Sequence, residues 1–300
     1  MKGSNIKGGS IRSLRSLSEV EVSGVKVNTT GKLTSFFAAL IVFSFLQSPV
    51  RSQDLEPGWK HWMFLNIDIP VTKKFSLSAE QQFSMNPGPY RLNMFTHSSN
   101  QGFAITKNFE LLAGYNVAIF PNGNEGRLAF HRIQTGFEAR QEIFGISCKH
   151  KVRVQYFIPT VRKYTARVVY QFRVNWKNKF LPMKGTPYMS HNLYYYIGGK
   201  PLLYYDEEGA VMAFQSPTDL HRYRMTLGCN FKPAKNVNVS LFYNCQWEFN
   251  TNLFPNRGLN VTRPGEPGAL LPFNNYWNYG AYVNLTLPTP GKKKKKKGDS

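Results

Sequence analysis

The sequence has little cysteine, no glycine-rich phosphate loop and only one long apolar run. Its three cysteines, Cys148, Cys229 and Cys245, are odd in number and lack metal-ligand spacing, and its six histidines form no pair at such spacing. Beyond residue 52, no segment approaches the about 18 consecutive apolar residues that a transmembrane helix needs. These absences argue against a disulfide scaffold, a zinc domain, a phosphate-loop enzyme and a helical membrane protein, and we expect no metal and no cofactor.

Acidic residues are also scarce, with 17 against 38 basic residues and a net charge of +21. Six of the positive charges form one run, Lys292 to Lys297, near the end of the chain. We interpret residues 291–300 as a solvated, disordered tail, with electrostatic attachment to anionic lipid or cell-wall polymer as the alternative. Nucleic acid is not expected as a partner, because no DNA-binding helix motif accompanies the charge.

The one long apolar run, FFAALIVFSFL at residues 36–46, is preceded by Lys32 and followed by Pro49 and Val50-Arg51-Ser52. Its length, its flanking charge and the small residues after it are typical of a secretory signal cleaved after Ser52. The run is too short to span a bilayer comfortably. We therefore expect residues 1–52 to be a leader with a signal peptide.

The rest of the chain shows a period of two. Apolar or aromatic residues alternate with polar ones in short segments, as in RVVYQFRVNWK at residues 167–177. Aromatic residues make up 15% of the chain, yet its mean hydropathy is −0.37. A transmembrane β-barrel combines these two properties because every second residue faces a polar lumen. We predict that residues 53–290 form an outer-membrane β-barrel.

The pattern predicts an all-β, antiparallel up-and-down barrel of about 12 strands, within a range of 10–12. Gly198-Gly199 is predicted to be a two-residue hairpin turn, and 207–218 and 250–273 to be long external loops. The twelve expected strands are 60–69, 74–84, 91–105, 108–119, 127–140, 146–158, 163–177, 188–197, 200–206, 219–231, 236–249 and 274–287.

The alternation predicts a charged inner face. Pairing about the turn after Arg140 is expected to set Glu138 opposite Lys149 and Gln134 opposite Arg153. Two interpretations stay open: a basic lumen that favours anions, as in a narrow channel, or a structural plug of ion pairs that conducts nothing. The inward set is Glu80, Glu110, Arg132, Glu138, Arg140, Lys149, Lys151, Arg153, Arg167, Arg173, Arg222, Arg224 and Glu248.

Several segments resemble a family of Gram-negative outer-membrane proteins that is catalogued only as a domain of unknown function. They are the Trp59–Ile69 strand, KKFSLSAEQQF at 73–83, Ala113-Gly114-Tyr115, and the strands around Glu138-Ala139-Arg140 and Arg222-Tyr223-Arg224. The chain departs from the family pattern at Ser84, at Gln155 and in a last strand without a terminal aromatic residue. The resemblance implies an outer-membrane barrel of unassigned activity, with outer-membrane lipid, lipopolysaccharide and the barrel-assembly machinery as partners.

One short motif allows an enzymatic alternative. His97-Ser98-Ser99-Asn100 is similar to a pattern in outer-membrane phospholipases and lipid A deacylases, and its spacing puts His97 and Ser99 on one face of a strand. Pairing about Thr106-Lys107 brings Asn116 near His97 as an orienting group. The same register points the dyad into the lumen, away from membrane lipid, which argues against a lipid acyl hydrolase. A secreted, soluble β-sandwich that binds a ligand is the third hypothesis.

Overall fold

A computed structural model describes most of the chain after residue 57. The expected leader at 1–52 and the lysine-rich tail at 291–300 lie outside the described residues. The described ranges are 58–86, 92–123, 126–159, 163–177, 185–205, 208–251, 258–262 and 269–288.

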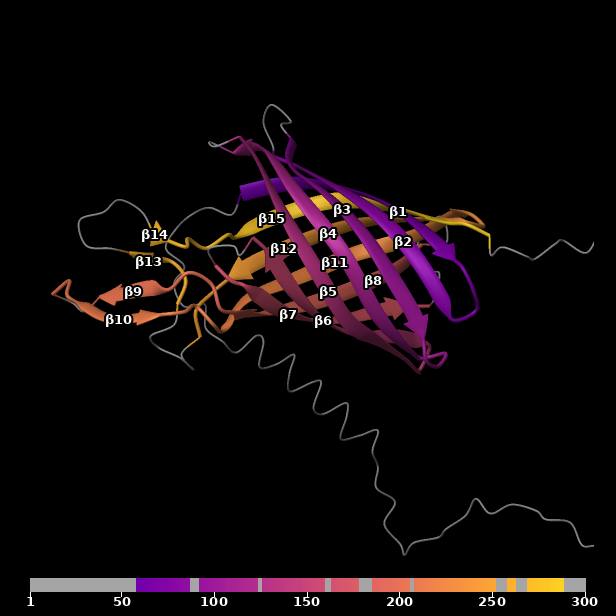
Figure 1. Ribbon diagram of the computed structural model, residues 1–300. Coiled ribbons are helices and arrows are strands. Elements are labelled where there is room, and N and C mark those ends of the chain that lie inside the picture. Colours follow the sequence, from indigo (N-terminus) through magenta and orange to yellow (C-terminus); the bar gives the residue numbers. More distant parts are fainter. Residues whose placement is uncertain are drawn as a thin grey trace, which may run out of the picture. The chain divides into compact units, whose positions relative to one another are not determined.

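Eleven strands close into one barrel (Figure 1), which confirms the all-β barrel and falls within the predicted range of strand number. The sheet is continuous around the barrel in the order β1-β15-β12-β11-β8-β7-β6-β5-β4-β3-β2. A sandwich of two stacked sheets, the third hypothesis, is therefore wrong. The barrel strands are β1 (Gly58–Pro70), β2 (Phe75–Met85), β3 (Leu92–Ala104), β4 (Phe109–Gly123), β5 (Gly126–Ile143), β6 (Ile146–Ile158), β7 (Ala166–Trp176), β8 (Thr186–Ile197), β11 (Leu220–Ala234), β12 (Val237–Glu248) and β15 (Tyr276–Thr286).

The closing pair differs from the expected antiparallel arrangement. β1 pairs with β15 in parallel, from Gly58 opposite Tyr276 to Asp68 opposite Thr286, whereas all other neighbouring barrel strands are antiparallel. An odd number of consecutively reversing strands leaves the first and last running in the same direction, so only a parallel pair can close the barrel.

The prediction that residues 200–206 form a barrel strand is wrong. Gly198 and Gly199 have φ values of 68° and 113° and lead the chain out of the barrel instead of turning it back. There β9 (Leu202–Tyr205) pairs with β10 (Val211–Gln215), and the chain returns as β11 beside β8. Leu202 is buried in an apolar cluster of loop and strand residues, which explains why this segment carries apolar residues without lining the barrel wall.

The barrel has two unlike ends. At the short-turn end lie the connections 71–74, 105–108, 144–145 and 235–236, together with the end of β15. At the long-loop end lie the described residues 198–205, 208–219, 249–251, 258–262 and 269–275, which include β9, β10 and the short pair β13 (Val261–Thr262) and β14 (Ala269–Leu270). Figure 1 shows both small hairpins at the same end of the barrel. Eleven strands thus place the short connections 71–74, 105–108, 144–145 and 235–236 at the same end of the barrel.

Large apolar side chains are exposed on the outer wall of the barrel. Met63, Ile133 and Leu241 are each more than half exposed. Towards the long-loop end, outward aromatic rings lie side by side: Tyr223 stacks on Trp247 with centroids 5.8 Å apart, and Tyr243 stacks on Trp277 at 5.7 Å. No described element packs over this wall, and no helix among the described residues is long and apolar enough to cross a membrane.

Candidate functional site

A cavity of about 1170 Å³ occupies the barrel interior. Residues of the short-turn connections, including Thr72, Lys73 and Lys74, line it, so the cavity extends to that end. On the opposite side, its lining reaches Trp62, Tyr194 and Arg224, beneath the long loops. The cavity is therefore the barrel lumen, and it extends from the short-turn end to the residues beneath the long loops.

The structure places the predicted inward charges on the inner face. Arg167, Arg222 and Glu248 lie near the long-loop end, where they contact inward tyrosines or one another. Nine of the thirteen predicted residues are basic and four are acidic. The ten that line the cavity are Glu80, Glu110, Arg132, Glu138, Arg140, Lys149, Lys151, Arg153, Arg173 and Arg224.

Cations outnumber carboxylates most clearly along β5 and β6. The Glu138 carboxylate alone serves three of them: its oxygens lie 2.6 Å from Arg140 Nε, 3.3 Å from Lys149 Nζ and 3.8 Å from Lys151 Nζ. Arg140 shares its charge with Glu110 at 2.9 Å. The buried Nε of Arg153 has no hydrogen-bond partner. This part of the lumen carries positive charge that the protein's own carboxylates do not neutralise.

The predicted register of β5 and β6 is wrong by two residues. Glu138 lies opposite Lys151, and Gln134 lies opposite Gln155, because the connection is the two-residue turn Phe144-Gly145 with φ values of 48° and 76°. The expected Glu138–Lys149 ion pair still forms, as a diagonal contact. A shift by two residues keeps each side chain on its face, so the inward assignment is unaffected.

A layer of arginine and aromatic side chains crosses the lumen next to the long loops. The guanidinium groups of Arg167, Arg222 and Arg224 lie 5.1, 5.4 and 5.4 Å from the centroid of the Tyr194 ring. Arg224 also lies 5.0 Å from the ring of Trp62. These cation–π contacts hold the three cations apart. The sequence pattern missed the inward rings, because in the run Tyr194-Tyr195-Tyr196 both faces are aromatic.

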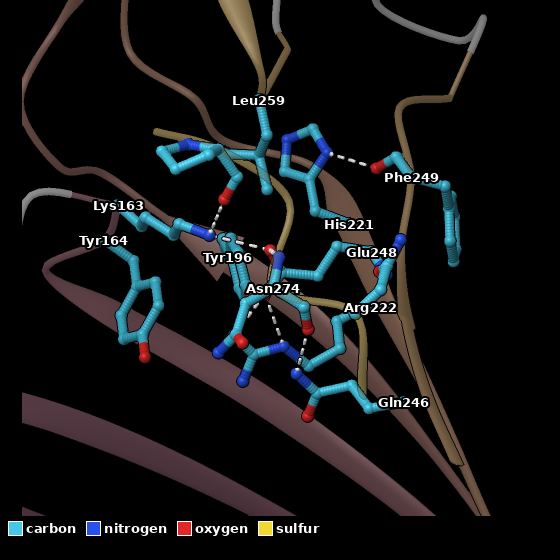
Figure 2. Close-up of polar contacts among 12 residues, drawn as sticks. Lys163, Tyr164, Tyr196, His221, Arg222, Gln246, Glu248, Phe249, Leu259 and Asn274 are labelled. Carbon is cyan, nitrogen blue, oxygen red and sulfur yellow. Dashed lines mark hydrogen bonds and ion pairs between the residues drawn. The ribbon is translucent and has the colours of Figure 1, made fainter. Parts of the chain in front are cut away.

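At the long-loop end, the Glu248 side chain forms hydrogen bonds both to loop residues and to residues of the barrel strands (Figure 2). Its side chain is completely buried and accepts hydrogen bonds from Lys163 Nζ at 2.7 Å, Arg222 Nε at 2.8 Å and the Tyr196 hydroxyl at 3.2 Å. It also accepts a bond from the backbone N–H of Asn274 at 2.8 Å, and Lys163 donates a second bond to the Pro272 carbonyl at 2.7 Å. We call Lys163, Tyr196, Arg222 and Glu248 the Glu248 cluster.

Apolar packing completes the closure of this end. Tyr196 is fully buried and belongs to a cluster with Leu202 beside β8 and with Leu259 and Leu271 from the last long loop. The loops thus contribute both a buried ion-pair network and an apolar core to the same end of the lumen. Among the described residues, these contacts cover the long-loop end of the lumen, whereas the cavity lining reaches the connections of the short-turn end.

The structure separates His97 and Ser99 from Asn116. Pairing of β3 with β4 sets His97 opposite Val117, and Asn116 opposite Ser98, one residue away from the predicted register. Asn116 faces the lumen, where its amide donates to Ser98 Oγ at 2.6 Å. His97 and Ser99 therefore lie on the outer wall, and the prediction that they point into the lumen is wrong. A one-residue shift moves a side chain to the other face of a sheet.

Outward histidines recur around the wall with polar partners on a neighbouring strand. His61, His131, His150 and His191 each form a hydrogen bond with a tyrosine hydroxyl, those of Tyr279, Tyr115, Tyr170 and Tyr223 respectively. His97 instead contacts Gln81 on β2, with Gln81 Nε2 2.6 Å from His97 Nδ1, and Ser99, with His97 Nε2 3.1 Å from Ser99 Oγ. The sequence pattern did not single out Gln81.

Within the described residues, no group of three or more histidine, cysteine or acidic side chains is placed to hold a metal ion. The three cysteine thiols are not joined in disulfides.

The comparisons with known proteins confirm that the chain contains a domain of unknown function. No curated protein matches the chain. A family described as "Protein of unknown function (DUF2490)" matches residues 59–255, which include ten of the eleven barrel strands. The match covers more than half of the chain, and the protein belongs to this family of unknown function.

Proposed function

We propose that this protein is an outer-membrane β-barrel whose lumen admits anions from the short-turn end and is closed to through-flow at the long-loop end. The observation that carries the proposal is the division of chemistry between the two faces of one closed sheet. The outer face carries mainly apolar and aromatic side chains. Of the thirteen charged residues predicted for the inner face, nine are cations and four are carboxylates. Lipid outside and water inside account for both faces.

The outward histidines support contact with hydrocarbon. A polar group in an apolar medium costs several kcal/mol unless it is hydrogen-bonded. His131 and His191, for example, each meet a tyrosine hydroxyl on the adjacent strand. Water would satisfy such groups without a partner, so regular pairing on an exposed wall favours a lipid environment.

The closed end favours a binding lumen over an open channel. The Glu248 cluster and the apolar packing of Leu259 and Leu271 lie between the cavity and the long-loop end. An anion that enters beside Lys73 and Lys74 meets Lys149, Lys151 and Arg153 before it reaches this closure.

Location and architecture are tested together. Fractionation of cells should recover the protein in the outer membrane, and the folded barrel should migrate faster than the boiled chain in detergent gels. Release of the protein from membranes by salt or carbonate would contradict the proposal.

The lumen is tested with a fluorescent trisulfonate, pyranine, and with planar bilayers. The parent protein should bind pyranine in a salt-sensitive way and should add no conducting steps. The double variant Lys149→Gln/Lys151→Gln should lose most of the binding. The matched control Lys107→Gln/Lys177→Gln, whose two lysines are exposed and outside the cavity lining, should retain it. Conducting steps of any ion selectivity, or equal binding by both double variants, would refute the proposal.

A further inference from the structure

Three polar side chains form a hydrogen-bonded chain on the outer wall between β2 and β3. Gln81 lies directly opposite His97 in the strand register, and its amide contacts His97 Nδ1 at 2.6 Å. The other ring nitrogen, Nε2, lies 3.1 Å from Ser99 Oγ. Ser99 is exposed and His97 is half-buried. The order of groups is therefore an accessible hydroxyl, an imidazole and an amide that holds the imidazole from behind.

We propose that Ser99, His97 and Gln81 form a nucleophile–base–orienting triad that hydrolyses acyl esters of lipids lying against the barrel wall. The inference rests on the proposed lipid contact of this wall and adds an activity to it. Histidine within hydrogen-bond reach of a serine hydroxyl, itself oriented by a third group, is the arrangement that activates serine in acyl transfer. Its position on the outer face removes the objection that a lumenal dyad could not reach lipid.

The reaction balances with water as the second substrate. Ser99 Oγ attacks the ester carbonyl carbon while His97 Nε2 accepts the hydroxyl proton. The bond from the carbonyl carbon to the alcohol oxygen then breaks, and the alcohol leaves with the proton from Nε2. Water attacks the acyl–Ser99 ester with His97 again as the base, which releases the fatty acid and restores the Ser99 hydroxyl. Ser99 and His97 are the catalytic residues, and Gln81 is a positioning residue.

Gln81 can set the tautomer that this chemistry requires. A base at Nε2 needs the ring proton on Nδ1, where an acceptor must face it. In the structure, Gln81 Nε2 faces the His97 ring, whereas Gln81 Oε1 is buried and has no hydrogen-bond partner. A half-turn of the amide brings Oε1 to Nδ1–H and leaves His97 Nε2 free to accept the proton of Ser99.

The surroundings leave Ser99 open to a substrate. The residue opposite it on β2 is Ala79, whose side chain is too short to cover the hydroxyl, and on β4 it faces Tyr115, whose own hydroxyl is bonded to His131. The outward histidines His61, His131, His150 and His191 each contact a tyrosine hydroxyl. His97 has an exposed serine hydroxyl as its partner.

The test uses the full chain inserted in phosphatidylethanolamine vesicles that carry a fluorogenic acyl ester, and a fluorophosphonate that labels activated serines. The parent should release the fluorophore and be labelled on Ser99. Ser99→Ala should abolish both signals, and His97→Ala should lower the rate about 10²- to 10⁴-fold. Gln81→Leu should lower kcat at least about tenfold with KM unchanged and alter the pH profile, an effect that a merely structural role would not produce.

Two controls separate this triad from the arrangement expected from the sequence. Ser98→Ala changes the inward serine next to Ser99, and Asn116→Ala changes the residue that the sequence pattern places beside His97. Both variants should hydrolyse the ester and be labelled like the parent protein. Heat-modifiable migration verifies that each variant folds.

Inserted, folded parent protein that neither hydrolyses the ester nor labels at Ser99 overturns the triad and leaves the barrel proposal intact. Hydrolysis that persists in Ser99→Ala also overturns it. Failure of the parent to insert into vesicles contradicts the proposed function, and the triad with it.

Discussion

A lysine placed on the outer wall distinguishes a barrel in lipid from a barrel in water. Ile133 lies at the middle of β5, points outward between Tyr115 on β4 and Tyr156 on β6, and is 54% exposed. Full burial of an isoleucine contributes about 1.5–3 kcal/mol, so hydrocarbon over its exposed half accounts for about 1–1.5 kcal/mol. Bringing a lysine into the bilayer adds a desolvation cost, for a total of about 2–4 kcal/mol near the midplane.

The assay is equilibrium unfolding by urea in phosphatidylcholine vesicles, followed by the fluorescence of the chain's five tryptophans. We expect Ile133→Lys to lower the free energy of unfolding by about 2–4 kcal/mol. The matched control is Val71→Lys, in the 71–74 connection at the barrel end, where a 37% exposed valine lies outside the strands. It should cost at most about 1 kcal/mol. A wall in water would tolerate both changes within about 0.5 kcal/mol, and equal effects of the two variants would refute our reasoning.

Two further variants test the closed end and the closing seam. Glu248→Gln removes the carboxylate that is completely buried against Arg222 and Lys163, and should lower the free energy of unfolding in urea by about 3–5 kcal/mol. Glu142→Gln, at the exposed pair with Lys177, should cost about 0–1 kcal/mol, and a similar cost for both would contradict the role of the Glu248 cluster. Gly280→Val should prevent heat-modifiable migration, because a Cβ there would lie 2.0 Å from the Trp62 backbone oxygen across the β1–β15 seam. Gly58→Val, where a Cβ meets nothing within 4 Å, should fold normally, and a folded Gly280→Val protein would show that the seam is not as tight as described.

The periodicity of the sequence was sufficient to predict the barrel and most of its strands. In β7, alternation places Arg173 inside, with its Nε 2.9 Å from Asn175 Oδ1, and leaves Trp176 on the exposed wall. Periodicity failed at 200–206, where Leu202 is apolar because it packs under a loop. Alternation reports which side of a segment is buried. It cannot report whether the burying surface is lipid, a loop or another strand.

Register was the least predictable property, and its errors had unequal consequences. At Phe144-Gly145 the shift was two residues, so Glu138 and Lys149 stayed on the same face and still met. At the 105–108 turn the shift was one residue, and His97 moved from the predicted lumen to the outer wall. The length of a turn therefore decides on which face of the sheet a candidate residue lies. The sequence pattern does not fix the length of a turn to the single residue. The Glu248 cluster was beyond prediction for another reason: Lys163 and Pro272, more than a hundred residues apart, meet only in the folded loops.

The distribution of charge inside the barrel bears on whether the inner residues are a structural plug or a binding surface. Near the long-loop end, Glu248 contacts both Arg222 and Lys163, and the ring of Tyr194 contacts Arg167 and Arg224. Along the cavity wall, Glu138 contacts three cations, of which Arg140 also pairs with Glu110, and Arg153 keeps an unpartnered Nε. A plug selected for stability alone would balance charge throughout, because an uncompensated buried cation is costly. Excess positive charge on the inner face is better explained by an anion that occupies the lumen.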